Sequence, residues 1–496
     1  MRAFQSCVQP SFGAHLASFS PNFGADFGLM PQLLSPAMFP RLLALALLSA
    51  TALAADDYGK STAAPAIPPP QPGPAYLQLA PMLGHIGPTE ARVWVKATGA
   101  AKLTMRVSER ADLADAREVA GPELQEASAF TGVVIIPGLK AATPYFYTVL
   151  LDGQPALARP WPAFSTAPAD GARGKLRFAF GSCVGKEPWL AAATWADLDA
   201  RTAVNFVLLL GDNHYANTTD PAKQRAAFIG HRRNPGFRAL FAHTPLYGIW
   251  DDHDFGVNDS DGSQTGKEDS LRTFSEFFAN AGAGEPDNPG IYFKFTRGDV
   301  DFFLLDVRYH RSPIKAPDDG TKTQLGAKQL AWLKRELLAS KATLKVIGSG
   351  GEWQSHSSED SWKSYAREEQ EIFDHLAEHD IRNVLLLSGD RHFTAAYHVR
   401  GRFIEVTSGP LGSPGAKSKP VPEMFAYRDG GRFFCIYDID TAATPPAVAL
   451  EIWQTGVGLV EKRAFTWEQV TGGAKIEPKL PPLKSAPVPA PPAIKE

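Results

Sequence analysis

The fold of this chain is decided by one stretch, Val204-Asn-Phe-Val-Leu-Leu-Leu-Gly-Asp-Asn-His-Tyr215. Its first half is an almost continuous apolar run, which is typical of a strand buried on both faces of an interior sheet. Its second half places Asp212 and Tyr215 directly after the strand ends. In an open α/β sheet, ligands bind at the carboxyl ends of the strands. The stretch therefore predicts an α/β domain with its chemistry at one edge of a sheet.

Three further segments repeat this arrangement of an apolar run followed by polar side chains. They are Phe178-Ala-Phe-Gly-Ser-Cys183, Gly248-Ile-Trp-Asp-Asp-His-Asp254 and Leu385-Leu-Leu-Ser-Gly-Asp-Arg-His392. If the four strand ends meet at one crevice, they bring together Cys183, Asp212, Tyr215, Asp252, His253, Asp390 and His392. Close carboxylates repel one another unless a cation or a proton lies between them. The set therefore predicts a metal-dependent hydrolase.

The hydrophobic pattern of the sequence divides the chain into two folded regions. From residue 176 onward, buried strands alternate with amphipathic helices such as 327–339 and 365–379, which predicts a catalytic α/β domain over 176–467. Residues 76–167 instead carry short alternating strands separated by turn residues, a pattern typical of a β-sandwich. We expect this N-terminal sandwich to contribute little to the chemistry.

Composition narrows the function classes. At 496 residues the chain is long enough for two domains, and 44% hydrophobic residues are ample for packed cores. The formal net charge of −3 gives no indication of nucleic-acid binding, since nucleic-acid binders are usually basic. Three cysteines, Cys7, Cys183 and Cys435, are too few for a disulfide framework. We expect Cys183 to bind a metal as a thiolate and not to pair with Cys435.

The N-terminal part of the sequence predicts export. A basic start, a short apolar core and an A-x-A site predict a Sec-type signal peptide over residues 38–55, with residues 1–37 as a mis-assigned upstream extension. The apolar core is too short to span a bilayer. Residues 56–75 and 474–496 are rich in proline and predict a linker and a disordered tail. We therefore expect an exported protein, periplasmic or extracellular.

In their order, the four segments resemble the alkaline phosphatase D (PhoD-like) family of the metallophosphoesterase superfamily. Gly-Ser-Cys183 stands where common dinuclear phosphoesterases have Asp-x-His, and Gly-Asp212-x-x-Tyr215 matches a motif shared with purple acid phosphatases. Trp-Asp-Asp252-His-Asp replaces Gly-Asn-His-Glu, and Gly-Asp390-Arg-His replaces Gly-His-x-His. The resemblance implies a metallophosphoesterase-type sandwich of two β-sheets flanked by helices.

A second, shorter resemblance concerns the N-terminal region. The element Leu139-Lys-Ala-Ala-Thr-Pro-Tyr145 resembles the fibronectin type III signature, in which a tyrosine corner closes a strand. It implies that the β-sandwich which precedes the catalytic domain is fibronectin-III-like.

The donor types indicate which metals fit. A thiolate at Cys183 and a phenolate at Tyr215 suit a trivalent, iron-like ion. Asp212 has two oxygens and can bridge two metals, while Asp252 and Asp390 add hard oxygens that suit Ca²⁺ or Mn²⁺ better than Zn²⁺. The family resemblance points the same way, to a dinuclear or multinuclear centre of Fe³⁺ with Ca²⁺, with Mn²⁺ or Zn²⁺ as alternatives.

Neighbouring residues receive roles beside the metals. The resemblance implies that His253 contacts phosphate oxygens or protonates the leaving group. Arg308, at another strand end, is either a bidentate phosphate clamp or the partner of an interior Asp. His392 is either a metal ligand, which we favour, or a donor to a ligand. We expect Asp251 in a turn beside the ligands and Asp254 to orient its neighbours.

The resemblance implies an exported phosphatase that cleaves small phosphate monoesters, diesters or both, by attack of a hydroxide that the metals activate. The sequence leaves the preferred ester and the oligomeric state open. Two other classes remain as alternatives: a non-catalytic exported protein that binds a surface polymer, and a metal-dependent oxidoreductase. The oxidoreductase alternative is disfavoured because no G-x-G-x-x-G fingerprint follows a strand. Metal content of the pure protein separates the hydrolase from the binding protein.

Overall fold

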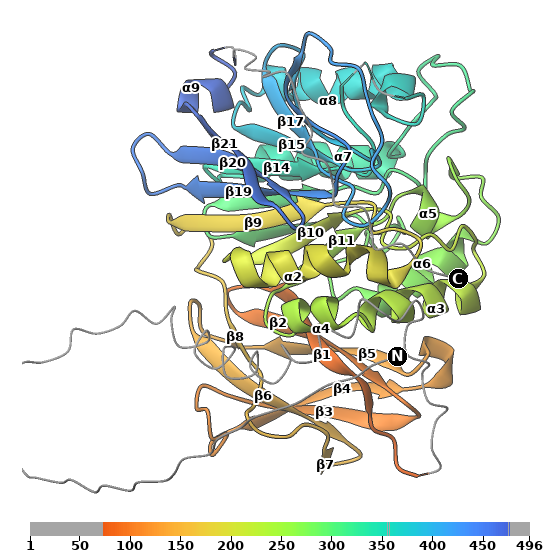
Figure 1. The fold of residues 1–496 in the computed structure, drawn as a ribbon, viewed down its shortest axis with the longest axis vertical. Coiled ribbons are helices and arrows are strands. Elements are labelled where there is room, and N and C mark those ends of the chain that lie inside the picture. Colours follow the sequence, from red (N-terminus) through yellow and green to blue (C-terminus); the bar gives the residue numbers. More distant parts are fainter. Residues whose placement is uncertain (1–72, 355, 357, 475, 477–496) are drawn as a thin grey trace, which may run out of the picture. The chain divides into compact units, whose positions relative to one another are not determined.

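The computed structural model describes residues 73–476, apart from 355, 357 and 475. The extension 1–37, the signal peptide 38–55, most of the linker 56–75 and most of the tail 474–496 therefore lie outside the described residues and stay predictions. The described strands form four sheets, two in the N-terminal region and two in the α/β domain (Figure 1).

The N-terminal region is built from antiparallel strands that share one core. One sheet has the order β1-β2-β5, and the other has the order β4-β3-β6-β7 with β8 beside β6. Inward-facing side chains such as Leu103 and Val134 are fully buried together. The strands are β1 (Leu77–Ile86), β2 (Glu90–Ala97), β3 (Ala101–Ser108), β4 (Arg117–Leu124), β5 (Thr131–Pro137), β6 (Pro144–Leu151), β7 (Gln154–Pro155) and β8 (Ala163–Ser165), with a 3-10 helix η3 (Glu126–Ser128) between β4 and β5.

Tyr145 has the contact of a tyrosine corner. Its Oη accepts a hydrogen bond from the backbone amide of Lys140 at 3.0 Å. Strands and a common core thus occupy the span predicted for a β-sandwich, and the fibronectin type III likeness of this region stays a prediction.

The α/β domain contains a six-stranded sheet of order β11-β10-β9-β19-β20-β21. Strand β10 runs parallel to both β9 and β11, so these three strands end at the same edge. All five residues of β10 are buried, which explains its continuous apolar run. The strands are β9 (Lys175–Gly181), β10 (Phe206–Leu210), β11 (Leu246–Ile249), β19 (Phe433–Asp440), β20 (Ala447–Gln454) and β21 (Gly458–Phe465).

A seven-stranded sheet of order β12-β13-β14-β15-β17-β16-β18 packs against it. The ring of Phe178 in β9 meets the ring of Phe302 in β13 edge-on, with centroids 5.1 Å apart. Strands β13, β14, β15 and β17 are mutually parallel. The strands are β12 (Phe293–Arg297), β13 (Val300–Leu304), β14 (Leu344–Gly348), β15 (Val384–Ser388), β16 (Thr394–Val399), β17 (Phe403–Thr407) and β18 (Met424–Arg428).

Helices cover the outer faces of this pair of sheets (Figure 1). Trp195 and Phe228 pack from α2 and α3 into the core of the six-stranded sheet, while Leu333 and Leu376 pack from α7 and α8 against the other sheet. The α/β domain with two packed sheets and flanking helices is confirmed. The helices are α2 (Ala192–Arg201), α3 (Pro221–Arg232), α4 (Pro235–Phe241), α5 (Asp252–Phe255), α6 (Lys267–Phe277), α7 (Ala327–Ala339), α8 (Ala366–Glu378) and α9 (Trp467–Val470), with 3-10 turns η4 (Pro188–Ala191) and η5 (Trp362–Tyr365).

No helix in the described part of the chain combines the length and the apolar character needed to cross a bilayer.

Candidate metal centre

The four predicted segments meet at one edge of the two packed sheets. Cys183 follows β9, Asp212 follows β10, Asp252 begins α5 just after β11, and Asp390 follows β15 of the facing sheet. Because β9, β10 and β11 are parallel, their carboxyl ends lie side by side. The topology therefore brings the predicted segments together, and it gathers residues as far as 207 positions apart in the sequence.

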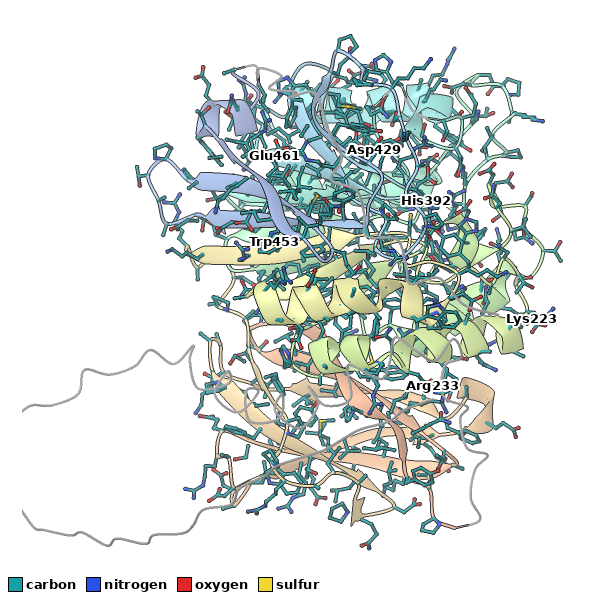
Figure 2. The ribbon with its side chains drawn as sticks, in the orientation of Figure 1. Lys223, Arg233, His392, Asp429, Trp453 and Glu461 are labelled. Atoms are coloured by element: carbon teal, nitrogen blue, oxygen red, sulfur yellow. The ribbon has the colours of Figure 1, made fainter. Side chains whose placement is uncertain are left out.

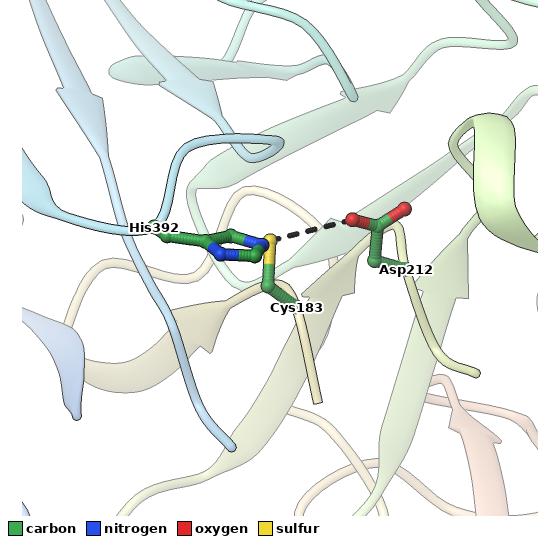
Figure 3. Close-up of side chains that lie close together, drawn as sticks. All are labelled: Cys183, Asp212 and His392. Carbon is green, nitrogen blue, oxygen red and sulfur yellow. Dashed lines mark hydrogen bonds between the residues drawn. The ribbon is translucent and has the colours of Figure 1, made fainter. Parts of the chain in front are cut away.

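Cys183, Asp212 and His392 form the first donor group. Their ligand atoms all lie within 4.8 Å of one another, and Cys183 Sγ is 3.4 Å from Asp212 Oδ2 (Figure 3). Tyr215 joins this group because its Oη lies 2.9 Å from Asp212 Oδ2 and 3.2 Å from His392 Nε2. Figure 2 labels His392 within the α/β domain. Four predicted ligands from three strand ends thus share one small volume.

Asp212, Asp252 and His253 form a second donor group, again with ligand atoms within 4.8 Å of one another. Asp212 belongs to both groups, which is the placement expected of a ligand that bridges two cations. The His253 ring lies 4.1 Å from the Tyr215 ring between centroids, and its Nδ1 contacts Asn217 Oδ1.

Asp390 lies beside these groups, and its carboxylate is not a member of either. Its backbone carbonyl lies 3.3 Å from Cys183 Sγ. Its side chain faces a cavity of about 440 Å³. That cavity is lined by Asp259, Ile314, Lys315, Ser358, Glu359, Asp360, Asp390 and Arg391. A ligand role for the Asp390 carboxylate stays a prediction.

The backbone is strained where the ligands sit. Cys183, Asp212 and Asp390 have φ angles of 61°, 53° and 66°, in the left-handed region that non-glycine residues seldom adopt. Each such residue costs about 1–3 kcal/mol and persists only when its surroundings enforce it. Gly389 shows one enforcing contact, because a Cβ there would lie 2.4 Å from the carbonyl oxygen of Leu210. Close approach of two strand ends therefore sets the position of Asp390.

Among the described residues, no arginine or lysine forms an ion pair with Asp212 at the centre of the crevice. Burial and the neighbouring carboxylates Asp252 and Asp251 raise the pKa of Asp212 well above its usual range. Burial and the Asp212 charge likewise raise the pKa of the Cys183 thiol, and burial with nearby acids raises that of Asp390. Asp212 Oδ1 and Asp390 Oδ2 are buried without a hydrogen-bond partner among the described residues.

This donor set fits bound cations. A thiol, a phenol and several carboxylates keep their protons here only because nothing positive replaces them. A cation would hold the sulfur deprotonated and would satisfy the orphaned oxygens. The two histidines fit as well, since burial lowers the pKa of His253 and of His392 and keeps both imidazoles neutral, the form that binds metals.

Arg308 requires a correction to the predicted phosphate clamp. Its side chain is completely buried, its Nε donates to Asp251 Oδ1 at 2.6 Å, and both terminal nitrogens donate to the Asp360 carboxylate at 3.1 and 2.7 Å. A further hydrogen bond reaches the carbonyl of Ser260. The structure thus shows the second alternative, in which Arg308 pairs with interior acids.

Asp360 and Arg311 are parts of the site that the sequence pattern did not reveal. Asp360 and Asp259 form a third acidic group with Asp252. Arg308 and Arg311 bind Asp360 and lower its pKa to about 2, despite its burial. Because Asp360 lies in a loop and follows no apolar strand, no local signal marks it.

Asp254 has the orienting role that was expected. Its two oxygens accept hydrogen bonds from the amides of Asn213 at 2.7 Å and Asp251 at 3.1 Å. It therefore ties the segment after β10 to the segment after β11. Asp251 caps α5 from the position just before it, and its Oδ1 accepts from Arg308.

The two described cysteines are both buried and free of a disulfide. Cys435 lies opposite Phe180 in the pairing of β19 with β9, in the core of the domain. None of the donor groups in the described part of the chain includes a residue of the N-terminal sandwich.

The sequence pattern that defines the PhoD-like phosphatases matches residues 178–429, just over half of the chain and all of the candidate ligands. The chain belongs to the PhoD-like phosphatase family. Residues 74–169 match a separate domain of unknown function, DUF7800.

Individual relatives agree with this assignment. Alkaline phosphatase D of Bacillus subtilis (strain 168) is 25% identical over 301 residues, which cover 50% of this chain and 51% of the relative. The chain thus spans about half the length of that relative. The solved structure of PhoD superposes with a TM-score of 0.63 at 19% identity, covering 82% of this chain and 95% of the other. A purple acid phosphatase from yellow lupin (Lupinus luteus) gives a TM-score of 0.61 at 13% identity, covering 79% and 76%. At these identities the two structures show a shared fold.

Proposed function

We propose that this PhoD-like protein is a metal-dependent hydrolase of phosphoric esters. The observation that carries the proposal is the pair of overlapping donor groups that share Asp212, one of whose oxygens is buried without a hydrogen-bond partner among the described residues. Metal ions bound there would supply a Lewis acid for phosphoryl oxygens and a water of lowered pKa. The fold shared with a purple acid phosphatase supports the same reading.

The kinds of donor atom divide the candidate ligands between two metal positions. Cys183, Tyr215 and His392 lie next to Asp212 and offer a thiolate, a phenolate and an imidazole, of which the two anionic donors suit Fe³⁺. Asp252 belongs to the second donor group and offers hard oxygen, which suits Ca²⁺ or Mn²⁺. Fe³⁺ with Ca²⁺ is the pair that this arrangement favours.

His253 is the group placed to handle a proton. Nδ1 of His253 contacts Asn217 Oδ1. When the neutral ring carries its proton on Nδ1 and donates it to Asn217, Nε2 has a free lone pair. That nitrogen accepts a proton from water or, once protonated, delivers it to the leaving-group oxygen. Packing against the tilted ring of Tyr215 and the contact with Asn217 fix the ring for either step.

We propose small phosphate monoesters and diesters as substrates, cleaved outside the cytoplasm. The order of a basic start, an apolar core and an A-x-A site over residues 38–55 supports export. The cavity of about 440 Å³ beside Asp390 is large enough for a phosphoryl group with a small leaving group.

Metal analysis and turnover on matched cysteine variants test the proposal. We expect the purified wild type to contain iron and a second metal, and to hydrolyse p-nitrophenyl phosphate, bis-p-nitrophenyl phosphate or both. Cys183→Ser should lose the iron-like metal and most turnover, whereas Cys435→Ser should keep both, because Cys435 lies in the core away from the donor groups. Full metal content and activity in Cys183→Ser, or a Cys183–Cys435 bridge in non-reducing mass analysis, would contradict the proposal.

A further inference from the structure

Arg391 is an arginine of the centre whose charge is only partly used inside the protein. It directly follows Asp390 and lines the same cavity of about 440 Å³. Its side chain is 29% exposed, whereas the Arg308 side chain is 0% exposed. A guanidinium at the wall of the cavity is therefore open to a molecule inside it.

The internal partners of Arg391 lie at the limit of an ion pair. Its Nε is 3.5 Å from Glu352 Oε2, and one terminal nitrogen is 3.8 Å from Asp390 Oδ2. Its buried Nε has no hydrogen-bond partner among the described residues. Charge-assisted hydrogen bonds are normally 2.7–2.9 Å long, so these carboxylates attract the guanidinium without using its donors.

The guanidinium is nevertheless held in place. One contact is the ring of Phe393, whose centroid lies 5.3 Å from Cζ of Arg391. The other is Glu352, which is only 1% exposed and is itself fixed by Tyr397 Oη and Gln354 Nε2 at 3.4 and 3.2 Å. The guanidinium of Arg391 is thus fixed in position while some of its N–H groups remain unused. Such a group is pre-organised to bind a ligand.

Two of the four acids that line the cavity already pair with cations of the protein. Arg308 and Arg311 bind Asp360, and Lys363 Nζ lies 2.8 Å from Glu359 Oε1. Lys315 adds a second cation to the lining. The chemistry that fits is a tetrahedral oxyanion, whose paired oxygens match the fork of a guanidinium.

We propose that Arg391 binds the phosphoryl group of the substrate, one of the two roles that the sequence left open for Arg308. This inference rests on the proposed function, since it names the residue that orients the phosphate ester beside the donor groups. Arg391 then donates to non-bridging oxygens, holding the phosphorus beside Asp390, while Lys315 stands at the rim for further negative charge.

Direct binding of inorganic phosphate to the metal-loaded full chain tests this role. Titration calorimetry should show phosphate binding to the wild type, and Arg391→Ala and Arg391→Gln should weaken it by about 10- to 100-fold, the loss of one or two charge-assisted hydrogen bonds. Arg391→Lys should fall between, because Lys keeps the charge and loses the fork. Added guanidinium should restore part of the binding in Arg391→Ala. The control Arg335→Ala, on the exposed face of α7, should match the wild type.

Hydrolysis measured on the same samples tests the role of Arg391 separately from the proposed function. We expect KM for p-nitrophenyl phosphate to rise with the phosphate Kd, while metal content stays at the wild-type level. Wild-type phosphate affinity in both Arg391→Ala and Arg391→Gln, or loss of metal in both, would overturn the inference and leave the proposed function standing. Phosphate binding that depends on Arg391, in a metal-loaded protein that cleaves no ester, would overturn the proposed function alone.

Discussion

Two clusters of buried acids lie next to each other in this protein, and they are balanced in opposite ways. In one, Arg308 binds both Asp251 and Asp360, and Arg311 binds Asp360 as well. The pKa of Asp360 falls to about 2, whereas burial still raises the pKa of Asp251 to about 7. In the other, Asp212 has only neutral donors as partners, and its pKa rises well above the usual range.

The residue type and the burial are nearly the same in the two clusters, so the partner decides the charge state. Burial alone disfavours a carboxylate; two guanidinium groups reverse that effect at Asp360, and a single one offsets it only in part at Asp251. For Asp360 the chain supplies its own cations. Among the described residues the chain supplies no such cation to Asp212, and it keeps a strained backbone at Cys183, Asp212 and Asp390. We infer that a metal ion completes this site.

Asp212→Asn should give the largest change, because it removes the ligand shared by both donor groups. We expect turnover to fall by about a thousandfold or more and metal content to drop. Metal-free Asp212→Asn should unfold at the same temperature as the metal-free wild type or a higher one, because an uncompensated acid is gone. Turnover, elemental analysis and thermal unfolding measure this, with the exposed Asp269→Asn as control. If Asp212→Asn retained both metals, Asp212 would not be the ligand that the two metal positions share.

Arg308→Leu should break the other cluster and cost stability. It leaves Asp251 buried without a cation and leaves Asp360 with Arg311 alone, which costs about 3–5 kcal/mol of the free energy of unfolding. Arg272→Leu is the matched control, since it removes an ion pair whose two side chains are 56% and 43% exposed and which is worth less than about 1 kcal/mol. Urea unfolding compares them. Equal losses in the two variants would show that Arg308 does not compensate the interior acids.

The pH dependence of stability should separate the metal-free from the metal-loaded protein. In the metal-free fold, Asp212 and Asp390 bind protons at pH values where the unfolded chain has released them. The free energy of unfolding should therefore fall as pH rises from about 5 to about 8. Metal should flatten this slope. Asp254 and Glu405, whose pKa burial raises to about 8, add the same slope to both forms. Identical slopes in thermal melts with and without metal would argue against cations in the crevice.

Tyr145→Phe should give the smallest effect and sharpens the contrast between the sandwich and the centre. Loss of the hydrogen bond between Tyr145 Oη and the Lys140 amide should cost about 1 kcal/mol of stability. Turnover and metal content should match the wild type, since no donor group among the described residues includes this region. A change in either would mean that the sandwich contributes to the site.

Much of the fold could be predicted because its signals are local. The helical periodicity at 327–339 and 365–379 agrees with α7 and α8 to within a residue, since an amphipathic helix carries its burial pattern in its own sequence. The apolar runs before Cys183, Asp212 and Asp390 lie in β9, β10 and β15 for the same reason.

The environment of each arginine could not be predicted in this way. Arg308 follows a strand just as the ligands do, yet it is buried against Asp360, fifty-two positions away. Arg391 follows a ligand and faces a cavity. Nothing in the neighbouring sequence distinguishes the two, because the distinction depends on which loops fold over each guanidinium.

By itself, the sequence determined the chemistry that is available: which donor atoms follow which strands, and in which family's order. A strand's apolar run and its terminal residue are adjacent in the chain, so they are visible together. Only the tertiary structure decided how those charges are balanced, because desolvation and pairing depend on distances between segments that are far apart in the sequence. It showed Asp212 shared by two donor groups, Arg308 used up by interior acids, and Arg391 left with donors to spare.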